Sequence, residues 1–153
     1  MLGRSYEREN CSAARALELV GERWSLLILR DAMYAGSTRF NQFQRSLGIA
    51  SNVLSARLDW FVESGLMDST TVPGGTDTHE YVLTTKGRGL EPVILALSAW
   101  GDQWAAPDGP PIEYHHDQCG GRVRQYLECE TCHEKPQPGD VVATPGPGMR
   151  AVS

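Results

Sequence analysis

Apolar residues recur at helical spacing through the first half of the chain and predict a succession of helices. The first helix covers Ser12–Val20, with a serine suited to cap its start and Gly21 placed to close it. The second covers residues 22–35 and contains the run Trp-Ser-Leu-Leu-Ile-Leu, which is apolar nearly all round. A helix without a polar face must be covered by its neighbours, so we expect it to form the buried centre of the domain.

A short third helix and an amphipathic fourth helix follow on either side of Gly48. Ser37 or Thr38 can cap the third, in which apolar residues recur three and four positions apart: Phe40, Phe43 and Leu47. Ser51 caps the fourth helix, which runs through Glu63, and Gly65 is placed to end it. Its apolar stripe should dock on the core: Leu54, Leu58, Phe61 and Val62.

Residues 66–72 and 79–84 alternate in strand fashion around Pro-Gly-Gly-Thr-Asp at residues 73–77, which predicts a β-hairpin. A last long helix then begins at Thr84 or Thr85 and continues to Trp104. Four of its apolar residues share one face: Val93, Leu97, Trp100 and Trp104.

Composition divides the chain at residues 105–111, Ala-Ala-Pro-Asp-Gly-Pro-Pro. We therefore expect a domain over residues 1–104, a linker, and a small extension over residues 112–153 with short strands and a frayed end. The chain has 153 residues and is 41% hydrophobic, which suits one ordinary domain with an appendage. Without a membrane-length apolar run or a signal-like start, the expected location is the cytoplasm and no membrane partner is expected.

The net charge of −5 is unevenly distributed, because residues 22–58 hold five arginines against two acidic residues. Helix, glycine turn, helix and hairpin in this order predict a mainly α fold of the winged helix-turn-helix type, with the hairpin as wing. Small residues at the start of the fourth helix can approach base edges: Ser51, Asn52, Ser55 and Ala56. Candidates for phosphate contact are Arg39, Arg45 and Arg57, with His79 in the wing. An ordinary helical hairpin with a solvated charged face is the alternative.

Several motifs in order also carry a family resemblance: residues 11–30, 37–43, 48–51, 54–58, 80–87 and 100–101. Over about residues 11–104 the chain resembles the HxlR-type, MarR-like transcription regulators of bacteria. The resemblance implies a homodimer joined through terminal helices and sequence-specific binding of duplex DNA at a near-palindromic operator. The stripe from Val93 to Trp104 suits that dimer interface, and packing within one chain is the alternative. The wing departs from the family pattern, since residues 68–80 contain no Lys or Arg.

Cys11 precedes the first helix, where some members of this family have a redox-sensing cysteine. A helix N-terminus lowers a thiol pKa, and Arg8 or Arg15 could help, whereas a small buried residue is the alternative interpretation.

The extension contains His116-x2-Cys119 and Cys129-x2-Cys132, separated by nine residues. Three thiolates and one imidazole can hold a structural zinc ion, and His115 and His133 are spare candidates for the imidazole. Unliganded cytosolic thiols are the alternative. DNA binding itself requires no cofactor on this interpretation.

An enzyme is not indicated, because the chain contains no phosphate-binding glycine loop, serine nucleophile elbow or zinc-protease motif. The alternative function is a non-enzymatic adaptor that binds other proteins through the Cys/His extension.

Overall fold

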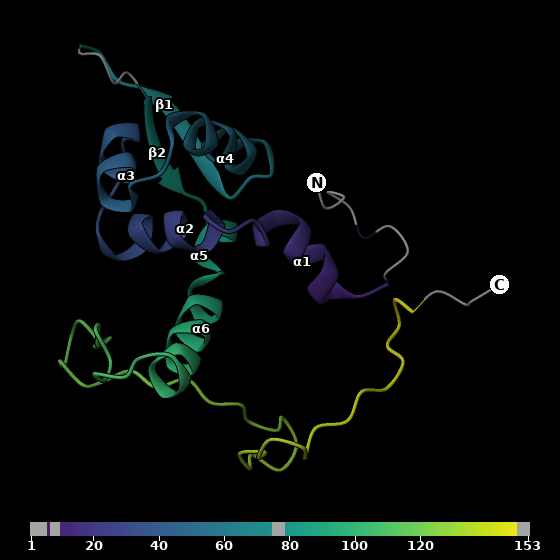
Figure 1. Ribbon diagram of the computed structural model, residues 1–153. Coiled ribbons are helices and arrows are strands. Elements are labelled where there is room, and N and C mark those ends of the chain that lie inside the picture. Colours follow the sequence, from purple (N-terminus) through teal and green to yellow (C-terminus); the bar gives the residue numbers. More distant parts are fainter. Residues whose placement is uncertain (1–5, 7–9, 75–78, 150–153) are drawn as a thin grey trace. The chain divides into compact units, whose positions relative to one another are not determined.

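The computed structural model describes residue 6 and residues 10–74 and 79–149. It forms two compact units, Met1–Ile94 and Leu95–Ser153. The boundary between residues 104 and 105 that composition suggests stays a prediction. In order, the elements are α1 (Ser12–Val20), α2 (Ser25–Tyr34), α3 (Phe40–Leu47), α4 (Ser51–Glu63), β1 (Met67–Thr71), β2 (His79–Leu83), α5 (Thr85–Arg88) and α6 (Glu91–Trp104) (Figure 1). No helix among the described residues is long and apolar enough to cross a bilayer.

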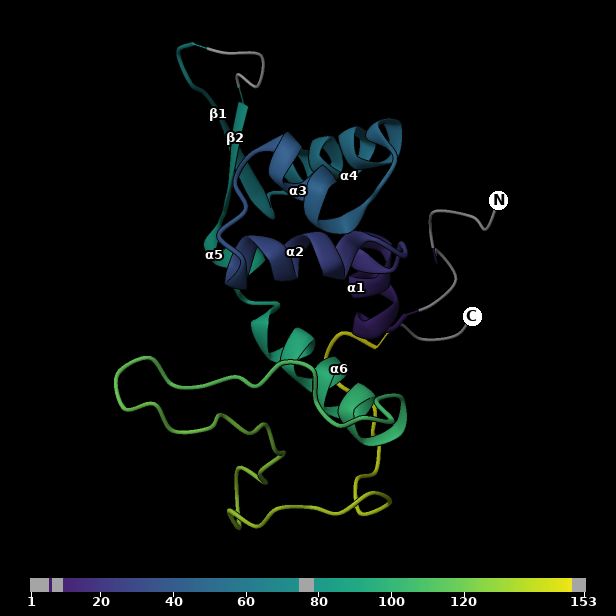
Figure 2. The ribbon, with the colours of Figure 1, turned by 60° about the vertical axis from the view of Figure 1, so that its left-hand side comes forward.

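The first unit has the winged helix-turn-helix architecture expected from the sequence. α3 packs on both α2 and α4, while β1 contacts α4 and β2 contacts α2 (Figure 2). β1 and β2 are antiparallel, in a register that runs from Met67 opposite Leu83 to Thr71 opposite His79. The expected turn at residues 73–77 lies in part outside the described residues.

The helix starts differ from the predicted caps. α2 begins at Ser25, because the Glu22 carboxylate accepts a hydrogen bond from the N–H of Trp24 at 3.0 Å and holds the preceding residues in a turn. α3 is begun not by a hydroxyl cap but by Gln42, whose Oε1 accepts from the N–H groups of Thr38 and Arg39 at 2.9 and 3.0 Å. The prediction that Ser51 caps the fourth helix is also wrong.

Ala50 holds the N-cap position of α4, and Ser51 is the first helical residue. The end of α4 follows the prediction closely, since Gly65 adopts φ +72. The N–H of Leu66 donates to the carbonyl of Phe61 at 2.8 Å, and that of Gly65 donates to Val62 at 3.1 Å. This pair of bonds is a Schellman motif, which turns the chain from α4 directly into the wing.

The long last helix predicted from Thr84 or Thr85 is two helices. Thr84 caps α5, accepting a hydrogen bond from the N–H of Gly87 at 3.1 Å. This helix ends with Gly89 as its C-cap, and α6 begins at Glu91. Pro92 explains the break, because a proline has no N–H to continue the helical ladder and is best accommodated in a first turn.

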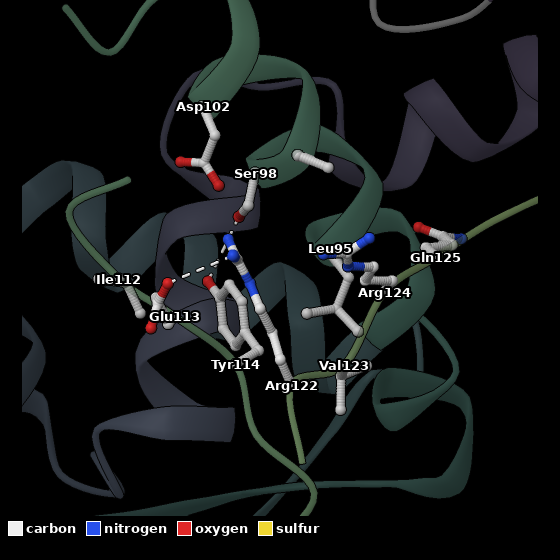
Figure 3. Close-up of a pocket in the computed structure, with 11 residues that line it drawn as sticks. Leu95, Ser98, Asp102, Ile112, Glu113, Tyr114, Arg122, Val123, Arg124 and Gln125 are labelled. Atoms are coloured by element: carbon white, nitrogen blue, oxygen red, sulfur yellow. Dashed lines mark hydrogen bonds and ion pairs between the residues drawn. The ribbon is translucent and has the colours of Figure 1, made fainter. Parts of the chain in front are cut away.

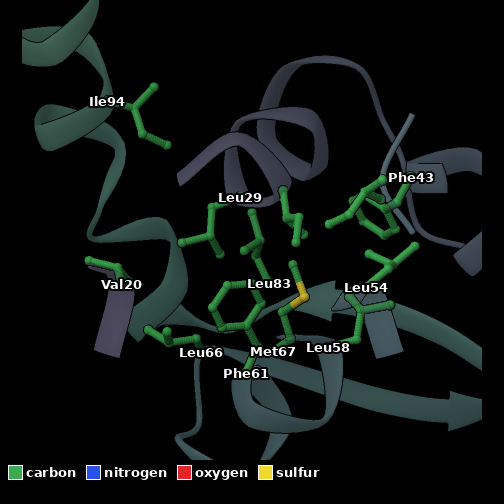
Figure 4. Packing of buried hydrophobic residues seen from close by; sticks show 12 residues of the cluster. Val20, Leu29, Phe43, Leu54, Leu58, Phe61, Leu66, Met67, Leu83 and Ile94 are labelled. Atoms are coloured by element: carbon green, nitrogen blue, oxygen red, sulfur yellow. The ribbon is translucent and has the colours of Figure 1, made fainter. Parts of the chain in front are cut away.

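The core of the first unit joins α2, α3, α4 and the base of the wing (Figure 4). Leu54, Leu58 and Phe61 of the predicted stripe are fully buried. Val62 is wrong as a core residue, since it is 36% exposed. It follows Phe61 by about 100° around the helix, which turns it away from the core. The remaining buried apolar members are Val20, Ile28, Leu29, Phe43, Ile49, Leu66, Met67, Leu83 and Ile94.

The short strands predicted for the extension are absent from the described residues up to 149, where only an isolated bridge pairs His115 with Arg122. The reason is lack of cover. Apart from Tyr114 and Pro136, every residue from 107 to 149 is exposed, so no apolar face is available to hold a small sheet.

Candidate nucleic-acid interface

A buried carboxylate in α2 fixes the helix-turn-helix on its support. Asp31 is 3% exposed, and its Oδ2 accepts a hydrogen bond from the Ser46 hydroxyl of α3 at 2.6 Å. Its Oδ1 accepts from Nε and Nη2 of Arg30 at 2.9 and 2.7 Å. This contact was missed in the sequence, where the only signal is an Arg-Asp pair inside an otherwise apolar helix.

The turn between α3 and α4 is held by a left-handed glycine and a side-chain hydrogen bond. Gly48 ends α3 at φ +62, a conformation that costs residues with a Cβ about 1–2 kcal/mol. Ile49 is buried beneath the turn. Nε2 of Gln44 donates to the Ser51 hydroxyl at 2.6 Å, so the last turn of α3 is tied directly to the first turn of α4.

The predicted base-reading residues all lie on the exposed side of α4. Ser51, Asn52, Ser55 and Ala56 are exposed, while Leu54 and Leu58 of the same helix are fully buried. No N-cap side chain accepts from the first backbone N–H groups of this helix. A small, polar helix start with uncapped donors is well suited to enter a groove beside phosphates.

The three predicted arginines are not equivalent in the structure. Arg45 is exposed in the last turn of α3, and Arg39 is half-buried at the N-cap of that helix. The side chain of Arg57 is only 19% exposed, and its Nε lies 4.0 Å from Oε2 of Glu22. Arg57 therefore joins α4 to the loop before α2, which limits its reach toward a phosphate.

The wing is anchored to the segment before α3. The N–H of Tyr81 donates to the carbonyl of Thr38 at 2.7 Å, and the Thr38 hydroxyl donates to Oε1 of Glu80 at 3.0 Å. His79 is exposed at the start of β2, with its Nδ1 3.4 Å from the hydroxyl of Ser69. The wing and α3 are thus positioned together.

Cys11 is exposed at the N-cap of α1, so the structure does not support the alternative of a small buried residue. Arg15 is directed elsewhere, because its Nη1 donates to Oε1 of Glu18 at 2.6 Å. Two hydrogen bonds hold the pKa of the Glu18 carboxyl below its ordinary value. The larger effect comes from the N–H of Tyr6 and the smaller from the Arg15 side chain. The other suggested helper, Arg8, lies outside the described residues.

The apolar stripe of α6 is exposed in the single chain. The exposed fractions are 46% for Val93, 54% for Leu97, 61% for Trp100 and 68% for Trp104. Ile94 on the neighbouring face is 4% exposed and belongs to the core. One side of α6 therefore leaves large side chains uncovered.

A hollow of about 290 Å³ lies between α6 and the extension, within the second unit (Figure 3). The Glu113 carboxylate and the Arg122 guanidinium form an ion pair at 3.4 Å, and Ser98 Oγ lies 3.3 Å from the Tyr114 hydroxyl. Of these two contacts, the one between Ser98 and Tyr114 connects α6 to the extension, and the ion pair lies within the extension.

The four predicted zinc ligands are exposed and are brought together in pairs. His116 Nδ1 lies 3.2 Å from Cys119 Sγ. The backbone N–H groups of Cys132 and Thr131, and the Cys132 side chain, hydrogen-bond to Cys129 and lower the pKa of its thiol. Within the described residues no group of three or more His, Cys, Asp or Glu side chains is gathered as a metal ion would need. The zinc site stays a prediction.

Comparison with known proteins agrees with this architecture. The family model described as HxlR-like helix-turn-helix matches residues 19–109. The HTH-type transcriptional regulator Rv3095 of Mycobacterium tuberculosis is 45% identical over 148 residues, which cover 96% of this chain and 93% of that protein.

Two solved structures extend the comparison. The chain is similar to the crystal structure of PA1607, a putative transcription factor, with a TM-score of 0.80, 36% identity, and coverage of 91% of this chain and 97% of that one. The reduced form of the redox regulator HypR is 28% identical with a TM-score of 0.55, and covers 61% of this chain and 92% of its own. The similarity to PA1607 thus reaches into the C-terminal extension, whereas that to HypR covers a much smaller share of the chain.

Proposed function

Because the chain belongs to the HxlR-like helix-turn-helix family of DNA-binding transcriptional regulators, which are not enzymes, we propose that it acts as a homodimer on a near-palindromic operator. The observation that carries this proposal is the exposed first half of α4, whose small polar residues stand above a fully buried Leu stripe. A helix in this position of a winged helix-turn-helix enters the major groove.

Asn52 is the residue on this face best suited to read a base. Its amide can donate and accept at once, which matches the N6 and N7 edge of adenine. Arg45, exposed at the end of α3, is the cation best placed to reach a phosphate, since Arg57 lies beside Glu22. Asn52 therefore supplies specificity and Arg45 supplies affinity.

Two copies of the chain are required by the proposed operator. A two-fold symmetric dimer presents its two α4 helices to half-sites one helical turn apart. The exposed stripe from Val93 to Trp104 on α6 supports a dimer, because large apolar side chains in a row are best covered by a second copy.

We expect the double substitution Arg45→Glu with Asn52→Ala to weaken operator binding by about tenfold or more, since one bidentate base contact is worth about 1–3 kcal/mol. The operator is first selected from random duplexes, and affinity is then measured by fluorescence anisotropy at two salt concentrations. Arg88→Glu makes the same charge change at an exposed position of α5, which adjoins the C-terminal end of α4 and not its first turn, and should preserve binding.

The double variant must keep its helical circular dichroism for this result to bear on recognition. Equal affinity of the variant and the wild type would refute the assignment of α4. A wild-type protein that retains no DNA even at low salt, where phosphate contacts are strongest, would favour the protein-binding adaptor.

We further propose that Cys11 makes this regulator sensitive to oxidants. Support comes from its exposed position at the start of α1 and from the redox regulator HypR among the proteins that it resembles. A hydroperoxide would oxidise the thiol to a sulfenic acid and would itself be reduced to the alcohol.

Treatment with hydroperoxide should lower operator affinity in the wild type and leave Cys11→Ser unchanged. The matched control is Cys119→Ser, which retains Cys11. An identical response of wild type and Cys11→Ser would exclude Cys11 as the sensor.

A further inference from the structure

The C-terminal extension contains two six-residue turns with the same backbone hydrogen bonds, one beginning at His116 and the other at Cys129. In the first, the N–H of His116 donates to the carbonyl of Gly121, and the N–H of Gly120 donates back to His116, both at 2.8 Å. In the second, the corresponding two bonds are both 2.9 Å long. The fifth residue is left-handed in each, with φ 68 at Gly120 and φ 59 at His133.

The left-handed histidine makes the second turn notable. His133 is the one non-glycine residue with a positive φ in the part of the chain that the structure describes. Such a conformation is uncommon without a glycine and indicates that the turn itself is strongly determined. Two segments of different sequence therefore adopt one turn, and both place a candidate metal ligand at the first and fourth positions.

Each turn directs its two candidate ligands toward each other. His116 Nδ1 and Cys119 Sγ are 3.2 Å apart. Two ligands of one tetrahedral zinc ion, with bonds of about 2.0 Å to nitrogen and 2.3 Å to sulfur, lie about 3.5 Å apart. In the second turn, the Cys129 thiol lies within hydrogen-bonding reach of the Cys132 side chain and of the backbone N–H groups of Cys132 and Thr131.

The two spare histidines are occupied by other partners. His115 Nδ1 lies 2.9 Å from the carbonyl of Gly120, and its Nε2 lies 3.6 Å from Glu113. His133 Nδ1 lies 3.0 Å from Oε1 of Glu128. These contacts leave His116 as the histidine whose ring nitrogen lies beside a cysteine sulfur.

We propose that one zinc ion joins the two turns, with His116, Cys119, Cys129 and Cys132 as its four ligands. Three thiolates and one imidazole form a closed tetrahedral set that suits a structural zinc, with the thiol protons released to solvent. The described residues of the extension, up to 149, bury no apolar core of their own, so the ion would supply the cross-link that stabilises it. Binding of the ion requires the nine residues between the pairs to bring the two turns together.

The first test is the metal content of the full-length, untagged protein, purified under reducing conditions and measured by elemental analysis. We expect close to one zinc per chain in the wild type and its loss in His116→Ala, Cys119→Ser, Cys129→Ser and Cys132→Ser. Matched controls remove the same atoms elsewhere and should keep the metal: Cys11→Ser, His115→Ala and His133→Ala.

A second measurement identifies the ligands directly. Cobalt(II) substituted into the site should show thiolate-to-metal charge-transfer absorption, reduced in each cysteine variant of the extension and unchanged in Cys11→Ser. Iron in place of zinc, or zinc retained by Cys129→Ser, would overturn the assignment. So would a metal-free wild type in which the extension's thiols react with a disulfide reagent as fast as Cys11.

Discussion

Gly87 lies where α5 approaches the base of the wing most closely. A Cβ at this position would stand 2.1 Å from the backbone carbonyl oxygen of Leu66. That carbonyl accepts hydrogen bonds from the N–H and hydroxyl of Thr84, so it cannot move without disturbing the cap of α5. The close contact between α5 and the base of the wing therefore requires a residue without a Cβ at position 87.

We expect Gly87→Ala to lower the free energy of unfolding by about 1–3 kcal/mol, because the added carbon must push the backbone apart. Gly101→Ala is the matched control, since a Cβ there meets no heavy atom within 4 Å. Within a helix that control should be neutral or stabilising by up to about 1 kcal/mol. Urea unfolding followed by circular dichroism measures both, and equal midpoints for the two variants would contradict the argument.

At the scale of elements, the helix ends separate what pattern can predict from what it cannot. The span of α4 and its Schellman end follow from an apolar stripe bounded by a glycine. The start of α3 does not, because Gln42 reaches back to two N–H groups and replaces the hydroxyl cap. Apolar spacing does not predict the break before α6 either, because residues 84–89 contain no apolar residue that could define a helical face. Hydrogen bonds from a side chain decided the first case, and the missing N–H of Pro92 decided the second.

The helix-turn-helix elements are connected by polar contacts between residues distant in sequence. Side-chain hydrogen bonds join Ser46 to Asp31, Gln44 to Ser51, and Thr38 to Glu80. Each contact joins a different pair of elements around α3. The recognition surface is therefore set by three side-chain hydrogen bonds as well as by the apolar core.

At the scale of the whole molecule, the stripe on α6 bears on assembly. We expect Trp100→Ser with Trp104→Ser to convert a dimer into a monomer at micromolar concentration, because these side chains are 61% and 68% exposed in the single chain. Sedimentation equilibrium measures the mass. Tyr126→Ser, which removes an exposed aromatic from the extension, is the control and should leave the dimer intact.

The variant with both tryptophans replaced should bind a single half-site about as well as the wild type does. It should lose the wild type's preference for the full operator. A wild-type protein that sediments as a monomer under the same conditions would refute the dimer and, with it, the palindromic operator.

The sequence by itself determined the class of fold, most helix spans, the strand pairing and the apolar stripe of α4. These depend on periodicity and on glycines at chain reversals, which act over a few residues. It also placed Asn52 and its neighbours on an exposed helix start, since they fall on a different face of the helix from Leu54 and Leu58.

Only the tertiary structure decided which cations remain available and which polar groups hold the site together. In the sequence, Arg57 and Arg45 are equally good candidates for phosphate contact. The structure separates them, because Nε of Arg57 lies 4.0 Å from Oε2 of Glu22, a residue of another segment. The role of Asp31 in holding α3 on α2 is visible only in the structure, where the Ser46 hydroxyl donates to its Oδ2 at 2.6 Å. The matching turns at His116 and Cys129 likewise required backbone hydrogen bonds to be seen. Such contacts join residues whose separation along the chain carries no periodic signal, so they exist only once the chain has folded.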